Sequence, residues 1–530
     1  MPIELLKRNY ERSHLIKQVQ SYNGVWDLVI IGGGATGLGI ALDASARGYK
    51  TLLLEQADFA KGTSSRSTKL VHGGVRYLAQ GDVKLVREVS IERGLLYRNA
   101  PHLVKNQTFI IPIYSFIDKW KYFIGLKCYD WISGKLSMGA SEFISRSETL
   151  KKMPGIKKEG LIGGVLYHDG QFDDTRLAIN LVQSIWEKGG SALNYIKVTG
   201  LLKNESNQLS GVKAQDIETG DDFTFKAKAV VNATGVFVDE ILQMDKPGSA
   251  KTICVSQGVH VVLDKKFYPS EHAMMIPKTS DGRVLFAVPW HGKVVLGTTD
   301  TPVEQASLEP VALENEINFI LETASGFLTE KPERKDVLSV FAGLRPLAAP
   351  QGTDQKTKEI SRSHKIIVSP SNLFTILGGK WTTFRKMGED MIEEIEKKLN
   401  WSPTQTATTH LSIHGSDNKT DWNDPLYFYG SDAVEIKLQM NGTAGNWISE
   451  KLKIHPMQVT WAVKNEMART VEDVLSRRTR ALLLDAAESV RIAPEVAAIM
   501  AAELNKNQEW IDDQVKKYKD LADQYILIKN

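Results

Sequence analysis

The chain contains little cysteine. Its 530 residues include only Cys128 and Cys254, which are far apart, and no Cys-x-x-Cys pair occurs. This usage predicts neither a disulfide framework nor a zinc site, and we expect no metal to be bound. Two inert thiols fit a reducing compartment, so a cytoplasmic location is expected.

Long hydrophobic runs are also missing. No stretch of about 18 consecutive apolar residues occurs, so no transmembrane helix is expected. Residues 1–20 carry charges throughout and lack the apolar centre of a secretory signal. The net charge of +3 is too small to predict a nucleic-acid partner.

The chain has no internal repeat or low-complexity segment, and its length predicts two or three domains. A buried strand at Asp27–Ile31, a glycine-rich turn, a helix to about Gly48 and a second strand at Thr51–Leu54 form a β-α-β unit. Strands dominate residues 253–300, and helical patterns follow from about residue 387. We expect a linker within 401–415.

The glycine-rich turn, residues 32–37, fits G-x-G-x-x-G in the context that makes this motif specific. Gly32 allows a tight turn, Gly34 lets the backbone approach a pyrophosphate, and Gly37 permits close packing of the helix on the strand. The helix N-terminus attracts phosphate. Glu55 ends the next strand, where it can accept hydrogen bonds from ribose and would repel the 2′-phosphate of NADP. FAD and NAD both fit this motif.

The segment that follows Glu55 is dense in hydroxyl, glycine and basic residues. By composition it is either a cofactor-binding loop or a solvated loop. The run T-S-S-R-S-T-K-L-V-H-G-G-V-R-Y-L at residues 63–78 resembles the FAD-dependent, respiratory type of glycerol-3-phosphate dehydrogenase. The resemblance continues in order at residues 100–103, 173–176, 231–235, 296–300, 342–346, 378–385 and 477–480.

This resemblance implies a mixed α/β fold. A Rossmann-type FAD-binding part is expected at about 25–100, 160–250 and 340–395, with an antiparallel β-sheet substrate cap at about 101–159 and 251–340. Together they form an oxidoreductase core within 1–400, and 401–530 form a C-terminal α-helical domain. The implied reaction oxidises sn-glycerol 3-phosphate to dihydroxyacetone phosphate and passes electrons from FAD to membrane quinone.

The motif and the resemblance together indicate the residues that bind FAD. Val198, expected just after a strand at 193–197, is assigned to the adenine through its backbone. The full set of candidate positions is Gly32, Gly34, Ala35, Thr36, Gly37, Glu55, Thr63, Ser64, Ser65, Ser67, Thr68, Lys69, Leu70, His72, Gly73, Val198, Ala233, Thr234, Gly235, Gly379, Lys380, Trp381 and Thr382.

A dianionic phosphate calls for arginine and lysine. The positions that match the family's substrate site are Arg76, Tyr77, Arg345, Arg362, Lys380 and Thr383. Arg345 precedes Pro346, so we expect it in a loop. Arg362 comes just before an apolar strand at residues 366–368.

Two histidines compete as the catalytic base that accepts the hydroxyl proton. His72 lies in a glycine-flanked loop and is the preferred candidate. His260 lies inside a predicted strand at 258–263, where a satisfied core histidine is more common. Arg345 could instead stabilise the developing oxyanion without accepting a proton.

Residues 109–136 interleave aromatic and lysine side chains, a composition that suits either a membrane interface or a buried helix. The resemblance favours peripheral attachment to the inner face of the cell membrane, and a homodimer is a candidate assembly. No motif indicates the quinone site. Mitochondrial members of the family carry EF-hands, and the absence here of a D-x-[DN]-x-[DN]-G loop favours a bacterial-type enzyme without calcium control.

Two alternative functions share these motifs. A glycerol-3-phosphate oxidase would use the same flavin and substrate but pass electrons to oxygen. A non-catalytic flavin-binding regulatory protein would need no cluster of basic residues for phosphate. A hydrolase is disfavoured, because neither G-x-S-x-G nor H-E-x-x-H occurs.

Overall fold

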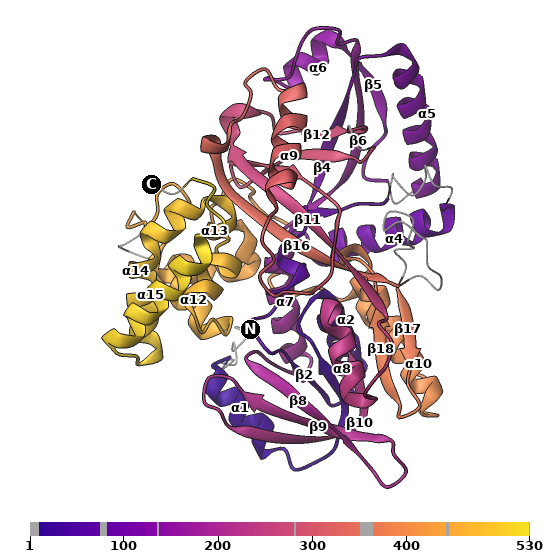
Figure 1. Ribbon diagram of the computed structural model, residues 1–530, viewed down its shortest axis with the longest axis vertical. Coiled ribbons are helices and arrows are strands. Elements are labelled where there is room, and N and C mark those ends of the chain that lie inside the picture. Colours follow the sequence, from indigo (N-terminus) through magenta and orange to yellow (C-terminus); the bar gives the residue numbers. More distant parts are fainter. Residues whose placement is uncertain are drawn as a thin grey trace, which may run out of the picture.

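The computed structural model describes residues 10–74, 82–134, 137–279, 282–349, 364–440, 442 and 445–528. Figure 1 shows two β-rich parts stacked along the long axis, with the C-terminal helices packed beside them. The chain crosses between the two β-rich parts several times, so each part is built from segments that are distant in sequence.

The lower part in Figure 1 is a sheet with the strand order β17-β18-β10-β1-β2-β7. Strands β18, β10, β1, β2 and β7 are parallel, while β17 is antiparallel to β18. Every residue of β2 (TLLL) and the last four residues of β10 (AVVN) are buried, as expected for strands covered on both faces. The strands are β1 Trp26–Ile31, β2 Thr51–Leu54, β7 Ser191–Leu193, β8 Ile196–Lys203, β9 Leu209–Asp216, β10 Asp222–Asn232, β17 Lys365–Val368 and β18 Leu373–Leu377.

Helix α2 (Ala35–Ala46) leaves the end of β1 and packs closely against α10 (Phe384–Lys398). A Cβ atom on Gly39 would lie 2.4 Å from the carbonyl oxygen of Phe384. A Cβ atom on Gly388 would lie 2.5 Å from the carbonyl oxygen of Gly39. The two glycines therefore let the helix backbones touch. The other helices of this part are α1 Arg12–Ser21, α7 Asp174–Glu187 and α8 Val238–Asp245.

The upper part is a ten-stranded sheet that is antiparallel apart from the parallel pair β4–β12. Its strands are β3 Leu70–Val71, β4 Val104–Ile113, β5 Glu142–Ser145, β6 Gly163–Phe172, β11 Ile253–Asp264, β12 Ala273–Ile276, β13 Leu285–Trp290, β14 Lys293–Gly297, β15 Thr301–Val303 and β16 Val337–Ala348. Its helices are α4 Val83–Asn99, α5 Phe116–Ser133, α6 Arg146–Lys152 and α9 Glu314–Phe327.

Helices dominate the C-terminal part. They are α11 Ala433–Gln439, α12 Pro456–Asn465, the π-helix Asp473–Arg478, α13 Ala481–Leu484, α14 Ala486–Leu504 and α15 Gln508–Ala522. The apolar faces of the helices from α12 onward form one cluster that also includes Val262 and Phe341 of the upper sheet, whereas Ala433 and Ile436 of α11 belong to the core of the lower part. The predicted mixed α/β fold with an antiparallel cap sheet and a C-terminal helical domain is confirmed.

Several local expectations differ from the structure. Arg345 lies in β16 rather than in a loop. Among the described strands, β16 pairs with β11 alone, so it is an edge strand. An edge strand tolerates a proline such as Pro346. Val198 lies within β8 rather than after a strand. Strands β3 and β6 and the end of β16 join the upper sheet, although they lie outside the ranges expected for the cap.

The aromatic segment 109–136 is also divided. Its first residues, 109–113, belong to β4 and are buried in the upper sheet, and only the residues from Phe116 onward form a surface helix, α5. Alternation of aromatic and basic residues does not by itself distinguish these two environments.

Candidate active site

The turn between β1 and α2 has the backbone geometry that the glycine motif predicts. Gly32 has a φ of 111°, and a Cβ atom there would lie 2.7 Å from the carbonyl oxygen of Ala233. A Cβ atom on Gly37 would lie 1.9 Å from the carbonyl oxygen of Gly32. The first turn of α2 therefore opens directly onto the space at the end of the parallel sheet, where its amide groups favour an anion.

Glu55 lies at the end of β2 beside this turn. One carboxylate oxygen accepts a hydrogen bond of 2.6 Å from the amide of Gly33, and the other accepts one of 2.8 Å from the amide of Ala57. Burial raises the pKa of Glu55, and the two amides partly offset that effect. Each carboxylate oxygen keeps a further acceptor position, so the group can also receive ribose hydroxyls.

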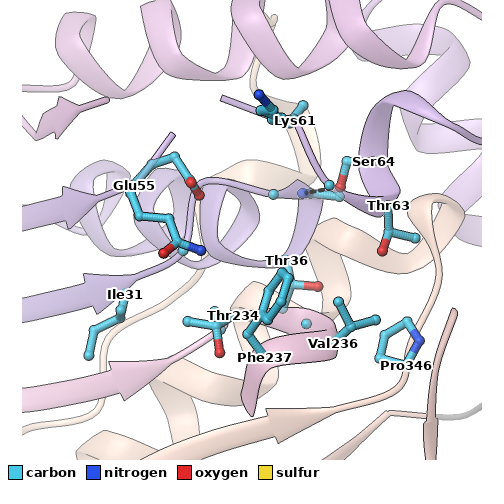
Figure 2. A pocket seen from close by; sticks show the side chains of 18 of the residues that line it. Ile31, Thr36, Glu55, Lys61, Thr63, Ser64, Thr234, Val236, Phe237 and Pro346 are labelled. Atoms are coloured by element: carbon cyan, nitrogen blue, oxygen red, sulfur yellow. Dashed lines mark hydrogen bonds between the residues drawn. The ribbon is translucent and has the colours of Figure 1, made fainter. Parts of the chain in front are cut away.

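These elements line the first of two adjoining cavities, which we call the nucleotide pocket. It encloses about 1200 Å³, including space open to solvent. Figure 2 shows Lys61 and Ser64 on one side, Thr234 and Val236 on the other, and Thr36 between them. The predicted cofactor residues that line it are Gly32, Gly34, Ala35, Thr36, Glu55, Thr63, Ser64, Val198, Ala233, Thr234, Gly235, Gly379, Lys380 and Trp381.

The second cavity, the inner pocket, lies between the two sheets and encloses about 1660 Å³. It shares Thr63, Pro346 and residues 378–381 with the nucleotide pocket, so the two cavities adjoin along a common wall. The predicted residues that line it are Thr63, Ser67, Thr68, Leu70, His72, His260, Arg345, Gly379, Lys380, Trp381 and Thr382. Its apolar end is lined by Phe109, Tyr167, Met275, Val284 and Phe286.

Arg345 projects from β16 into the inner pocket. Its Nη1 lies 3.2 Å from Asp300 Oδ1, and its Nη2 donates to Thr298 Oγ1 at 3.1 Å. A Cβ atom on Gly258 would lie 2.2 Å from Nη2, so only glycine at 258 leaves room for the guanidinium. The side chain is 23% exposed, which leaves its planar group accessible to an anionic ligand.

Both candidate bases reach the inner pocket. His260 lies in β11, is 2% exposed and stacks on Phe341 with ring centroids 4.8 Å apart. Burial, together with the positive charges of Arg345 and Lys69, holds the pKa of His260 well below its usual range, so the imidazole is neutral at physiological pH. His72 lines the same cavity from the loop after β3.

Some predicted residues do not line either cavity. The Nζ atom of Lys69 lies 2.7 Å from Asp174 Oδ2 and donates to the carbonyl oxygen of Ser65 at 2.6 Å, in a fully buried position. Gly73 donates its amide to Asp169 at 3.0 Å. The structure places Gly37, Ser65, Lys69, Gly73 and Thr383 behind the cavity walls, and Arg76, Tyr77 and Arg362 fall outside the described residues.

The sequence reasoning missed residues that complete the site. Lys61 lines the nucleotide pocket, while Thr298 and Asp300 hold the guanidinium of Arg345. Thr298 and Asp300 belong to the L-G-T-T-D run at 296–300, whose hydroxyl and carboxylate groups could have indicated a site. Lys61 begins the polar loop that the resemblance covers from residue 63.

The glycine turn, the partly buried Glu55 and the two adjoining cavities fit an extended dinucleotide with a reactive ring at the inner pocket. They define an FAD-dependent oxidoreductase. A family model described as FAD dependent oxidoreductase matches residues 27–383, and one described as the C-terminal domain of alpha-glycerophosphate oxidase matches residues 406–511.

Known relatives narrow the class. The mitochondrial glycerol-3-phosphate dehydrogenase of Homo sapiens is 37% identical over 92% of this chain and 73% of its own length. The mitochondrial glycerol-3-phosphate dehydrogenase of Schizosaccharomyces pombe is 36% identical over 97% of this chain and 89% of its own length. A crystal structure of the glycerol-3-phosphate dehydrogenase from Bacillus halodurans complexed with FAD, 29% identical, superposes with a TM-score of 0.79 over 98% of this chain and 99% of that one.

The chain therefore belongs to the family of FAD-dependent glycerol-3-phosphate dehydrogenases, as the run at residues 63–78 implied. FAD as the cofactor is confirmed.

Proposed function

We propose that this chain oxidises sn-glycerol 3-phosphate to dihydroxyacetone phosphate in the inner pocket and passes the electrons to a membrane quinone. The observation that carries the proposal is the position of Arg345, which lines a cavity that adjoins the nucleotide pocket. The names of the relatives support the same substrate.

The reaction removes a hydride from the C2 carbon of the substrate and a proton from its hydroxyl group. FAD, when bound, supplies the hydride acceptor. The guanidinium of Arg345 is suited to hold the phosphate or the developing negative charge on oxygen, and Lys380 adds a second positive charge in the wall that both cavities share. Asp300 and Thr298 orient the guanidinium.

The hydroxyl proton needs an acceptor in the inner pocket. His72 is the preferred base, because it lines the cavity from a loop next to glycine, where a substrate can approach closely. His260 is the alternative: it is neutral, and its Nε2 is hydrogen-bonded to Thr68 Oγ1 at 2.9 Å, and both residues line the same cavity.

A quinone acceptor is supported by the apolar end of the inner pocket. Phe109, Tyr167, Met275 and Phe286 belong to an apolar cluster that also contains Leu126 of α5. The apolar end therefore lies beneath a surface helix, and a lipid-soluble acceptor could approach from that side.

Helix α5 also supports peripheral membrane attachment. Its large exposed apolar residues lie within about 100° of one another around the helix axis. They are Phe116 (70% exposed), Ile117 (80%), Trp120 (58%), Ile124 (57%) and Trp131 (84%). Lys119 and Lys121 flank this face and Lys127 lies within it, a composition that suits a headgroup interface. Among the described residues, no helix is long and apolar enough to cross a membrane.

Anaerobic titration of the purified flavoprotein tests the substrate. Glycerol 3-phosphate should bleach the flavin absorbance, whereas glycerol and other polyol phosphates should do so weakly. Absence of bleaching would favour a regulatory flavin protein.

Light scattering of the same sample tests the predicted homodimer.

The second candidate function is a glycerol-3-phosphate oxidase, which the match of residues 406–511 favours. Peroxide release in air without quinone separates the two functions. We expect slow peroxide release and rapid reduction of an added quinone analogue.

A further inference from the structure

A buried ionic cluster joins the C-terminal domain to the segment at residues 55–66, which we call the cofactor loop because seven of its residues line the nucleotide pocket. At its centre is the carboxylate of Asp58, which is fully buried. Arg478 donates to both of its oxygens, from Nη1 at 2.6 Å and from Nη2 at 2.9 Å, and Arg477 donates from Nε. Both arginines lie in the π-helix Asp473–Arg478.

Two further contacts hold the same loop. The Nζ atom of Lys61, whose side chain lines the nucleotide pocket, lies 2.8 Å from Glu472. The guanidinium of Arg66 lies 2.6 Å from Glu309 and 3.3 Å from the hydroxyl of Tyr525, which in turn donates to Glu309 at 3.0 Å. Residues far along the chain therefore hold the loop at positions 58, 61 and 66.

The loop needs such support because its backbone is unfavourable. Ala60 has a φ of 60°, a left-handed conformation that is unfavourable for a residue with a Cβ atom. Its amide donates to the carbonyl oxygen of Gly33 at 3.0 Å, so the loop folds back onto the phosphate-binding turn. A shift of the loop would move both the turn and the lining residues that follow it.

Domain packing alone does not explain a cluster of this kind. Burying charges is costly, and replacing a buried ion pair by apolar residues is often neutral or stabilising. Ionic groups with several directed hydrogen bonds, however, fix the relative position of two elements far more narrowly than an apolar contact does. Arg477 and Arg478 line neither the nucleotide pocket nor the inner pocket, so any effect on the cofactor is indirect, and Asp58 connects them to the loop.

We infer that the C-terminal domain positions the cofactor loop, with Asp58, Arg477 and Arg478 as positioning residues that set the affinity for FAD. The C-terminal domain thereby acts on the cofactor without touching it.

The experiment compares two conservative substitutions at the same domain boundary. Arg478→Lys keeps the positive charge but removes the bidentate contact with the carboxylate of Asp58. The control is Arg469→Lys, because Arg469 makes a bidentate contact with Glu218 in the turn between β9 and β10, from Nε and Nη2 at 2.8 Å each, across the same boundary but away from the loop. FAD dissociation constants are measured by flavin fluorescence after reversible removal of the cofactor, together with melting temperatures.

We expect both variants to melt at lower temperature, but only Arg478→Lys to weaken FAD binding, by about tenfold or more. Equal dissociation constants in the two variants, whether both changed or both unchanged, would overturn the inference, because the cluster would then serve only to join the domains.

Glu472→Gln serves as a milder variant in case Arg478→Lys does not fold, because the side chain of Glu472 is 19% exposed. It should raise the FAD dissociation constant by about threefold or more and speed amide hydrogen exchange in residues 55–66 of the holoenzyme. An unchanged or lower dissociation constant would count against the inference.

Discussion

The Nε2 atom of His260 lies 2.9 Å from the hydroxyl oxygen of Thr68, inside a wall where burial keeps the imidazole neutral. Because the pKa of His260 is lowered on folding, the unfolded chain binds the proton more readily below about pH 6.5. The neutral histidine therefore contributes stability that is fully present above that pH and is lost as the pH falls toward the pKa of the folded state.

His260→Asn should reduce the slope of stability against pH between about pH 6.5 and 5 by up to about 1.4 kcal/mol per pH unit. Thermal unfolding of parent and variant at pH 7.5 and 5.5 measures this difference. The exposed His410→Asn is the control and should keep the parent's slope. Identical slopes in the parent and His260→Asn would contradict the prediction.

His72→Asn tests the preferred base. We expect flavin reduction by glycerol 3-phosphate to slow by about 10²- to 10⁴-fold, while FAD stays bound, because proton removal loses its acceptor. Stopped-flow absorbance under anaerobic conditions gives the rate. If His260→Asn causes the large loss and His72→Asn does not, the assignment of the base passes to His260.

Arg345→Ala should slow reduction by substrate by about 10²-fold or more and leave FAD binding unchanged, because the guanidinium lies against Asp300 and Thr298 and lines the inner pocket. Arg334→Ala, which removes an exposed arginine paired with Glu314, is the matched control and should retain the parent rate. Near-normal turnover in Arg345→Ala would remove this residue from the site.

Gly37→Ala should prevent stable folding or FAD retention, because its Cβ atom would lie 1.9 Å from the carbonyl oxygen of Gly32. Gly125→Ala in helix α5 has no atom within 4 Å of the added Cβ and should be neutral or stabilising by up to about 1 kcal/mol. Expression yield, flavin content and melting temperature distinguish the two. A stable, yellow Gly37→Ala protein would show that the turn can relax.

Charge on the exposed face of α5 should release the protein from membranes. Ile117→Glu and Trp131→Glu each place a carboxylate at a position that is 80% or 84% exposed, so they should lower sedimentation with anionic vesicles without changing reduction by substrate. Leu438→Glu changes an apolar side chain that is 68% exposed on α11 and should bind vesicles as the parent does. Equal loss in all three variants would argue against a defined membrane face.

Local patterns predicted the parts of the fold that depend on local physics. The strand–turn–helix unit around Gly32 was predicted from a few adjacent residues, since the glycine positions report directly on backbone geometry. The predicted cofactor residues from that turn to Thr63 line one cavity, apart from Gly37.

Distant partners could not be predicted in this way. Lys69 lies among hydroxyl residues that suggest ligand binding, yet its ammonium group is buried against Asp174, 105 positions away. The sequence predicts a loop at Arg345, because proline seldom occurs in the interior of a sheet. Arg345 and Pro346 instead lie in the strand β16. In α5, Trp131 is exposed and Tyr129 is only 2% exposed, because the two side chains point to different faces of the helix.

The strand order of the parallel sheet also has a consequence for biosynthesis. Strand β1 is completed on one side by residues 227–232, and these in turn pair with residues 373–375. A nascent chain that ends before residue 227 contains β1 and β2 but lacks β10, the strand that pairs with the other edge of β1. Pairings over such sequence separations form slowly. Capture of FAD is therefore an event of the nearly finished polypeptide, and the early strands depend on protection from aggregation throughout translation.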